Sequence, residues 1–389
     1  MEKGRTSCVG PPISIFSGQI RLASGRSHER QPTDGLILLK KLTILLTLLG
    51  LAAITAAMAW NGFDSVVAAV SRIGLVGFLL TILAQLAVDA VLGCAWYAAF
   101  PSMTYRHLMV ARMIRDAAST CLPFSQLGGI VLGIRATSRH HAVETSSIEW
   151  PEAACANVVD ITTEVLGQIV FILLAVTLLA VGSASNPLVK PVIIGALLLT
   201  AGATGFIWTQ QRGGTAVKRT VRLLGKHIAG QWQTTVMDGA GTLQDWMERA
   251  WSHPGRISAS AAIHLVGWIC SAGVLWLTVY LMGASLSFPD AIAIEGVTCG
   301  LMSASFLVPA ALGVQEGAYM TLGHAFGLDA SLCLALSLLR RGREISIGIP
   351  MLVWWQYSEM RALKARTAKT EARPLPDRMP DALTDTTEG

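Results

Sequence analysis

The stretch EGVTCGLMSASFLVPAALGVQEGAYMTLGHAFGLDASLCLALSLLRRGREISIGIPMLVWWQ, residues 295–356, decides the fold of this chain. Its first half is apolar but is interrupted by Pro309, Gly313 and Gly317. A continuous membrane helix needs about 20 apolar residues, so we expect two half-length helices between residues 295 and 327. Backbone that leaves the helix at membrane depth is tolerated only where protein or a water-filled cavity satisfies it.

The same stretch also carries ionisable side chains inside its apolar sequence. Such groups are costly in a bilayer and usually face the interior of a helix bundle or a pathway. The stretch is therefore expected to line a polar cavity in a membrane protein. The ionisable residues of the stretch are Glu295, Glu316, Arg340, Arg341, Arg343 and Glu344.

Three motifs in this region resemble a known family. They are VPAALGVQEG at 308–317, LLRRGRE at 338–344 and IPMLVWWQ at 349–356. Together they are similar to the C-terminal signature of the lysylphosphatidylglycerol synthase transmembrane (flippase-like) family, and within it to hopanoid-associated proteins of the HpnL type. The family often has glycine where this chain has Ala310 and Ala311, and commonly where it has Met351. The resemblance implies a multi-pass membrane protein that handles lipids.

The composition agrees with a membrane protein. Of the 389 residues, 52% are hydrophobic and 14% are charged, which is too apolar for an ordinary soluble domain. The net charge of +5 lies outside the apolar runs and favours a membrane surface; no nucleic-acid-binding module is present in the sequence. None of the seven cysteines forms a CxxC pair, so we interpret them as small apolar core residues.

Hydropathy predicts an all-α, polytopic integral membrane bundle with about six full spans. The polar segment 210–256 has apolar residues at helical spacing, which indicates an interfacial amphipathic helix or, alternatively, a packed cytoplasmic helix. Residues 1–41 and 359–389 are predicted to be a disordered extension and tail around a membrane domain at 42–358. The expected spans are residues 42–60, 73–100, 154–181, 191–209, 257–282 and 331–355.

Lys and Arg in the short loops predict the orientation. The basic N-terminus, the 210–256 segment and the C-terminal tail are expected in the cytoplasm, at the bacterial cytoplasmic (inner) membrane. The polar segments on either side of residues 117–134 then both come out cytoplasmic, so this segment should enter and return as a broken hairpin. By the same reasoning, residues 290–329 form a second hairpin that enters from the opposite face. A full span at 117–134 stays open, because Gly and Pro occur in ordinary membrane helices.

The two predicted breaks resemble each other in sequence. Pro123 precedes Gly128 and Gly129 in the first, and Pro309 precedes Gly313 in the second. Interrupted segments in corresponding halves of a transporter indicate a midplane site and an inverted repeat. Because the match is short, coincidence remains the alternative.

Asp160 and Glu164 are four residues apart, which places both carboxylates on one helix face. They are candidates to bind a cation, to relay a proton or to anchor a lipid headgroup. The alternative is that they pair with Arg112 or Arg115 and fix helix packing. His264 is interpreted as a hydrogen-bonded core residue rather than a proton carrier.

Glu316 follows a Pro–Gly break, and Glu295 lies in the partner limb of the same hairpin. Two carboxylates in one cavity would allow proton exchange, whereas the alternative is that Glu316 caps its own broken helix. Arg340 should pair with an acid, first of all Glu316, or bind a lipid phosphate in a bidentate fork. Arg340 and Glu344 lie four residues apart, and an internal ion-pair cluster that holds the bundle stays equally open.

No catalytic motif is recognised in the sequence, and the His140–His141 pair has no second ligand cluster. We expect no enzyme activity, no cofactor and no metal. The leading hypothesis is that the chain translocates, or helps to translocate, a hopanoid or glycolipid-like lipid. The alternatives are a scaffold for lipid-modifying enzymes or the membrane half of an aminoacyl-phospholipid synthase; only about 30 residues follow Glu359, fewer than a catalytic domain needs. The expected partners are membrane lipids and hopanoid- or lipid-modifying enzymes.

Overall fold

The computed structural model describes residues 63–121, 125–138, 148–182, 230–305, 308 and 311–371, with a few positions between 193 and 205. All of them belong to one structural unit, Leu42–Gly389. The described residues form helices and no strand, as predicted. The helices are α2 (Phe63–Ala99), α3 (Tyr105–Cys121), α4 (Ser125–Thr137), α5 (Trp150–Gly182), α8 (Gly230–Trp251), α9 (Pro254–Leu281), α10 (Phe288–Ala304), α11 (Val314–Ala325) and α12 (Ala330–Glu371).

Three of these helices are long and apolar enough to cross a membrane: Val70–Ala99, Trp150–Ala180 and Pro254–Leu281. They confirm the spans predicted at 73–100, 154–181 and 257–282. The predicted spans at 42–60 and, for the most part, 191–209 lie outside the described residues. The remaining predicted span, 331–355, falls within α12. This helix differs from the other three because it carries several charged residues inside its apolar sequence.

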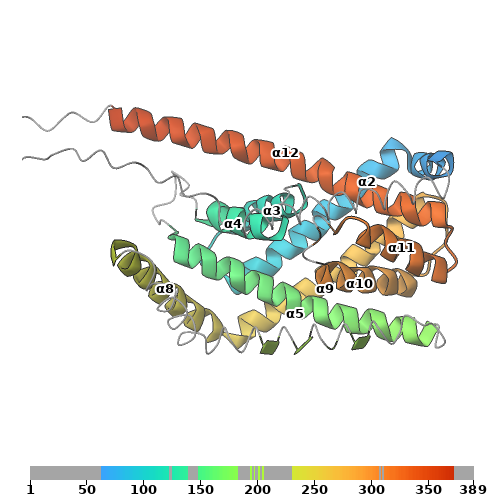
Figure 1. Ribbon diagram of the computed structural model, residues 1–389, viewed down its shortest axis with the longest axis horizontal. Coiled ribbons are helices and arrows are strands. Elements are labelled where there is room, and N and C mark those ends of the chain that lie inside the picture. The colour runs from blue at the N-terminus through green and yellow to red at the C-terminus, as the bar shows by residue number, and fades with distance from the viewer. Residues whose placement is uncertain are drawn as a thin grey trace, which may run out of the picture. The chain divides into compact units, whose positions relative to one another are not determined.

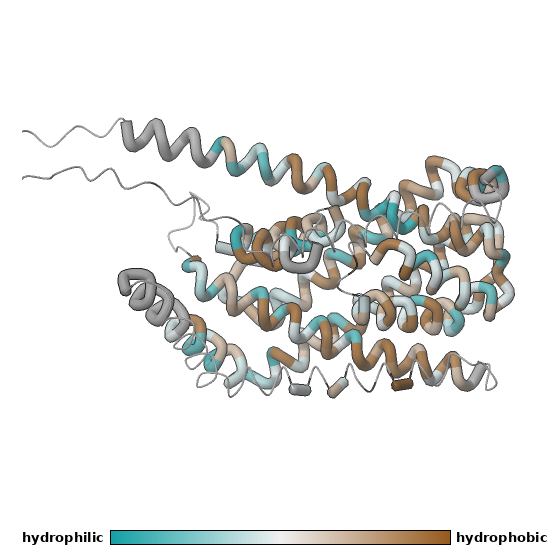
Figure 2. Tube along the Cα trace, in the orientation of Figure 1, coloured by the Kyte–Doolittle hydropathy of each residue, from teal (hydrophilic) through white to brown (hydrophobic). Residues whose placement is uncertain are grey.

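The surface of these spans is apolar, as contact with lipid requires. On α2, Leu75 and Val76 are each 74% exposed. Figure 2 shows apolar residues gathered along the C-terminal half of α5. Exposing such large apolar side chains to water would cost free energy. Here they lie on helices that are long enough to span a bilayer, where they contact lipid instead. The chain is therefore a helical membrane protein.

Helices α3 and α4 form the first predicted hairpin. His107, near the start of α3, has its Nε2 atom 2.7 Å from the carbonyl oxygen of Thr137 at the end of α4, so the two helices run antiparallel. With 17 and 13 residues, they are about 26 and 20 Å long at 1.5 Å per residue, shorter than the roughly 30 Å hydrocarbon core.

Glycines bring the two helices of this hairpin together. A Cβ atom on Gly129 would lie 1.9 Å from Ser119 Oγ and 2.9 Å from the Arg115 carbonyl oxygen. Gly128 and Gly129 were predicted to break the helix, which is wrong: both lie inside α4. These glycines allow the backbones of α3 and α4 to approach each other closely and do not form a turn. Pro123, the third residue of the predicted break, lies outside the described residues.

Helices α10 and α11 form the second hairpin. Ser287 caps the start of α10 by accepting a hydrogen bond from the Asp290 backbone N–H. At the break before α11, Gly313 has a φ of 82° and Ala311 a φ of 48°. Gly313 is thus a helix break, as predicted, and the family's glycine at position 311 suits a left-handed backbone. Gly317 was also predicted to break the helix, which is wrong, because it lies inside α11; Pro309 is outside the described residues.

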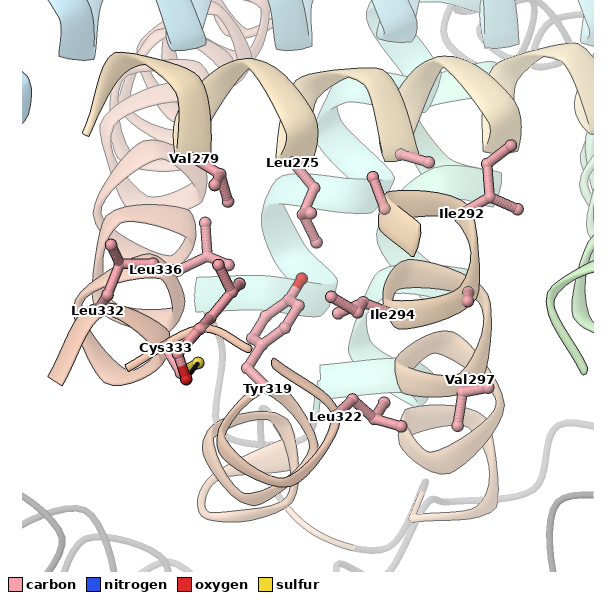
Figure 3. Close-up of a cluster of buried hydrophobic side chains, with 14 of the residues drawn as sticks. Leu275, Val279, Ile292, Ile294, Val297, Tyr319, Leu322, Leu332, Cys333 and Leu336 are labelled. Carbon is pink, nitrogen blue, oxygen red and sulfur yellow. Dashed lines mark hydrogen bonds between the residues drawn. The ribbon is translucent and has the colours of Figure 1, made fainter. Parts of the chain in front are cut away.

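Figure 1 shows α12 running along one side of the helices and α5 along the other, with both hairpins between them. The main core lies where α9, α10, α11 and α12 meet, and Figure 3 shows Tyr319 of α11 pointing into it among Leu275, Ile294 and Leu336. α12 continues to Glu371, so the first part of the tail predicted to be disordered is helical.

The segment predicted to be an amphipathic insert contains α8. The apolar repeat begins outside the described residues, at position 217. Within α8, Leu243, Trp246 and Met247 pack against a cluster that includes Cys155 and Val159 of α5. This part of the insert, which follows the apolar repeat, is a packed helix. The side chains of the repeat itself, at 217–236, lie outside the described residues, so both interpretations of the repeat stay open.

Candidate functional site

The tips of the two hairpins line the same cavity, which has a volume of about 550 Å³. Ser119 and Thr120 come from the first tip, and Ser303 and Gln315 from the second. The two tips therefore face each other across this cavity, whereas entry of the hairpins from opposite faces of the membrane stays a prediction. Figure 1 shows the two hairpins on opposite sides of the middle of the described helices. The walls between the tips are formed by Glu164, Val165, Gln168, Trp268, Arg340, Arg341 and Glu344, among others.

A second cavity of about 200 Å³ adjoins the first and shares Asp116, Glu164, Trp268 and Arg340 with it. It reaches α2 at Asp89, whose carboxylate accepts a hydrogen bond of 2.9 Å from Gln85 on the same helix. Both cavities are therefore lined by charged and polar groups within the membrane bundle.

Two arginines of α3 meet two carboxylates of α5 beside these cavities. Arg112 donates to Asp160 at 3.0 Å and to Glu164 at 2.7 Å. Arg115 donates to the same two residues at 2.7 and 3.1 Å. The i, i+4 spacing places the carboxylates side by side, so that each guanidinium fork bridges both of them. This matches the packing alternative, although Glu164 also faces the cavity.

These four side chains are strongly buried, with exposed fractions of 2% for Arg112, 6% for Arg115, 0% for Asp160 and 22% for Glu164. Removing one partner of such a cluster leaves a buried charge uncompensated, which costs about 3–5 kcal/mol. The cluster therefore fixes the first hairpin to α5. His264 on α9 closes it, with Nε2 at 3.5 Å from Asp160 Oδ1.

A second cluster joins α10, α11 and α12. Arg340 Nη1 donates to Glu295 Oε1 at 2.6 Å, and Arg340 Nε to Glu344 at 3.0 Å. The Tyr319 hydroxyl donates to Glu295 Oε2 at 2.8 Å, and Ser271 Oγ to Glu295 Oε1 at 3.1 Å. Glu295, with a side chain only 1% exposed, is thus fully satisfied by donors from three other helices.

A third cluster lies at the tip of the second hairpin. Arg341 donates to Glu316 through Nε at 2.5 Å and through Nη2 at 3.2 Å. Glu316 also accepts the Gly313 backbone N–H at 2.8 Å and the Ser337 hydroxyl at 3.3 Å. Glu316 therefore caps its own broken helix, as one alternative held, and pairs with α12 as well.

The expected pairing of Arg340 with Glu316 is wrong. Successive residues of a helix point about 100° apart, so neighbouring arginines reach different limbs of the hairpin: Arg340 meets Glu295 and Arg341 meets Glu316. The two carboxylates each have their own guanidinium and do not share a proton site. Arg343 is 6% exposed and borders a cavity of about 10 Å³ together with Glu295 and Arg340.

The structure adds residues that the sequence did not single out. Tyr319 and Ser271 complete the Glu295 cluster, and Gln168 donates to Ser303 of the hairpin tip at 2.9 Å. In an apolar membrane sequence such polar residues are a weak signal alone.

Asp160, Glu164 and His264 form the group of possible metal ligands found among the described residues, with ligand atoms within 4.8 Å of one another. Arg112 and Arg115 already bond to Asp160 Oδ2 and to both oxygens of Glu164. Two guanidinium ions at this distance oppose a cation by Coulomb repulsion, so the donor set does not suit a metal.

A comparison with curated protein sequences finds none that matches this chain. A comparison with protein families gives one match, to the family described as lysylphosphatidylglycerol synthase TM region, over residues 44–350. The match covers the described spans, both hairpins and the three charge clusters. The chain belongs to the lysylphosphatidylglycerol synthase transmembrane family.

Proposed function

We propose that this protein translocates, or assists in translocating, an amphipathic lipid across the bacterial cytoplasmic membrane, with both termini in the cytoplasm. The observation that carries the proposal is the cavity of about 550 Å³ between the tips of two opposed broken hairpins. Broken segments that meet near the midplane are the usual setting of a transporter's binding site. A polar headgroup could pass there while the lipid tails stay in the bilayer.

The cargo proposed is a hopanoid or a glycolipid-like lipid. This rests on the resemblance of the 308–317 and 338–356 motifs to hopanoid-associated proteins. The polar groups at the hairpin tips, Ser119, Ser303 and Gln315 among them, suit the hydroxyl groups of such a headgroup. The arginines of the cavity wall are held by internal carboxylates, which favours a headgroup recognised by hydrogen bonds over one recognised as a phosphate.

The test is lipid movement in vesicles that contain only the purified protein. Fluorescent analogues of a glycolipid and of phosphatidylglycerol are placed in both leaflets, and a membrane-impermeant quencher then reports how fast inner-leaflet lipid reaches the outside. We expect faster loss of the glycolipid signal than in protein-free vesicles. Equal rates for both lipids with and without protein would refute the proposal.

The family description favours a second candidate, in which the chain is the membrane half of an aminoacyl-phospholipid synthase. We propose transport without catalysis as the first choice. The same vesicles, supplied with lysyl-tRNA and phosphatidylglycerol, distinguish the two. Lysylphosphatidylglycerol formed by the purified chain alone would overturn the transport proposal, and formation only with an added soluble transferase would favour the second candidate.

A further inference from the structure

One ring nitrogen of His264 on α9, Nδ1, has its protonation state fixed by a hydrogen bond to the backbone. Its side chain is fully buried, and Nδ1 lies 3.1 Å from the Ser260 carbonyl oxygen. A carbonyl oxygen can only accept a hydrogen bond, so Nδ1 carries the hydrogen. Any proton that His264 gains or loses is therefore carried by Nε2.

Nε2 lies between one donor and one acceptor. Arg112 Nη1, a donor, is 3.4 Å away, and Asp160 Oδ1, an acceptor, is 3.5 Å away. Asp160 Oδ1 is buried and receives no hydrogen bond in the structure. A neutral imidazole accepts from Arg112 and leaves this oxygen unsatisfied, whereas a protonated imidazole donates to it.

The charges around His264 act in both directions: Asp160 and Glu164 favour a proton on the imidazole, whereas Arg112 and Arg115 oppose one, as does the burial of the ring. Arg112 and Arg115 of α3 face Asp160 and Glu164 of α5, and Asp116 adds a third carboxylate at 3.3 Å from Arg112 Nε. A proton on His264 therefore balances three carboxylates against three cations. Further charged groups of the helices packed around α9 lie along the cavities: Asp89, Glu295, Arg340, Arg343 and Glu344.

Glu164 connects this site to the cavities. Its carboxylate lies within 4.8 Å of the His264 ring nitrogen, and its side chain, 22% exposed, lines both cavities. A proton that reaches the site from the cavities therefore meets Glu164 before His264.

We propose that His264 and Asp160 form a proton-binding site, reached from the cavities on the side where Glu164 lies, whose occupancy sets how Arg112 holds the first hairpin. When the proton is bound, Arg112 loses its hydrogen bond to the imidazole but keeps its carboxylate partners. That this occupancy controls the movement of the first hairpin during lipid transport rests on the proposed function. The site itself is independent of it.

The first experiment observes the proton directly. The full-length protein, with ¹⁵N-labelled histidine rings and ¹³C-carbonyl serine, is placed in lipid and titrated by NMR from about pH 8 to about pH 5, the range in which histidine normally titrates. We expect one ring, correlated with the Ser260 carbonyl, in which Nδ1 keeps its hydrogen throughout and Nε2 gains one. The serine correlation assigns the signal even if a variant fails to accumulate.

Two variants serve as matched tests. His264→Gln should remove this signal, whereas His324→Gln, at an exposed residue near the end of α11, should retain it. An Nε2 that stays unchanged over the titration, or an Nδ1 that loses its hydrogen, would overturn the proposal.

The second experiment follows lipid movement at both pH values. We expect the wild-type rate to change by about fivefold or more, the usual scale of coupling between two sites, and the His264→Gln rate to stay constant. The same pH dependence in wild type and variant would overturn the control of transport. No lipid movement in wild type would refute the proposed function, while the NMR titration still decides the proton site.

Discussion

Glu316 and Arg341 form the pair in which structural and transport roles can be separated most sharply. Glu316→Gln removes the charge that faces Arg341 but keeps an acceptor for the Gly313 N–H, 2.8 Å away in the structure. With side chains 2% and 15% exposed, the pair is buried. Loss of one partner is therefore expected to destabilise the fold by about 3 kcal/mol, the lower end of the range for buried pairs because Arg341 borders the cavity.

Arg341→Gln should cost about as much, because Glu316 is then the uncompensated charge. The double variant has neither charge and should cost only about as much as one single variant. This corresponds to a coupling of about 3 kcal/mol. Unfolding free energies are to be measured in lipid bicelles, by titration with a denaturing detergent, on the wild type, both single variants and the double variant.

The matched control combines Glu316→Gln with Arg340→Gln. Arg340 bonds to Glu295 instead, so these two effects should add to within about 0.5 kcal/mol. A coupling between Glu316 and Arg340 as large as that between Glu316 and Arg341 would refute the assignment of the pairs. Lipid movement measured on the same proteins gives the second answer. Transport close to the wild-type rate in the Glu316–Arg341 double variant means that the pair only holds the bundle. Transport that stays lost in the double variant means that the charges act on the cargo.

Three further predictions follow from the hairpins. Gly129→Val should destabilise the protein by about 2 kcal/mol through overpacking, because its Cβ would lie 1.9 Å from a side-chain oxygen, whereas Gly317→Ala, with nothing within 4 Å, should be neutral or stabilising by up to about 1 kcal/mol; equal effects in thermal unfolding would contradict this. Ala311→Gly should raise stability by about 1 kcal/mol, since Ala311 has a φ of 48°, and a loss of stability in the same assay would speak against a left-handed residue there. In an otherwise cysteine-free chain, cysteines at Ser138 and Asp329, at the open ends of the two hairpins, should react with an impermeant maleimide from opposite sides of the membrane, and labelling from one side would exclude opposed hairpins.

Hydropathy predicted the all-helical architecture and three of the spans, whereas the count of about six spans stays a prediction. Three spans lie within a few residues of the predicted bounds, because a bilayer imposes a minimum length on any apolar helix. The two hairpins also followed from the sequence: the loop charges required the chain to return on one side, and a left-handed Gly313 marks the second break.

The site was only partly predictable. Sequence spacing gives which residues share a helix face, so the pairing of Asp160 and Glu164 with α3 was among the alternatives. Sequence spacing cannot give the rotation of α12 about its own axis. This rotation decides which acid each arginine meets, so that the neighbouring residues Arg340 and Arg341 pair with Glu295 and Glu316, respectively. The role of a glycine is equally hidden, since Gly129 and Gly313 look alike in sequence, but one allows helix contact and the other a left-handed turn.

The glycine contact between α3 and α4 determines how the first hairpin can move. A Cβ on Gly129 would meet Ser119, and one on Gly133 would lie 3.1 Å from Arg115 Cβ. At these two positions no side chain of α4 separates the helices, which restricts sliding and repacking between α3 and α4. The hairpin is therefore expected to tilt as a single rigid lever. The pivot point of this movement is the ion pair between Arg112 and Asp160 of α5. A small rearrangement of these charges is therefore expected to displace the hairpin tip by a larger distance.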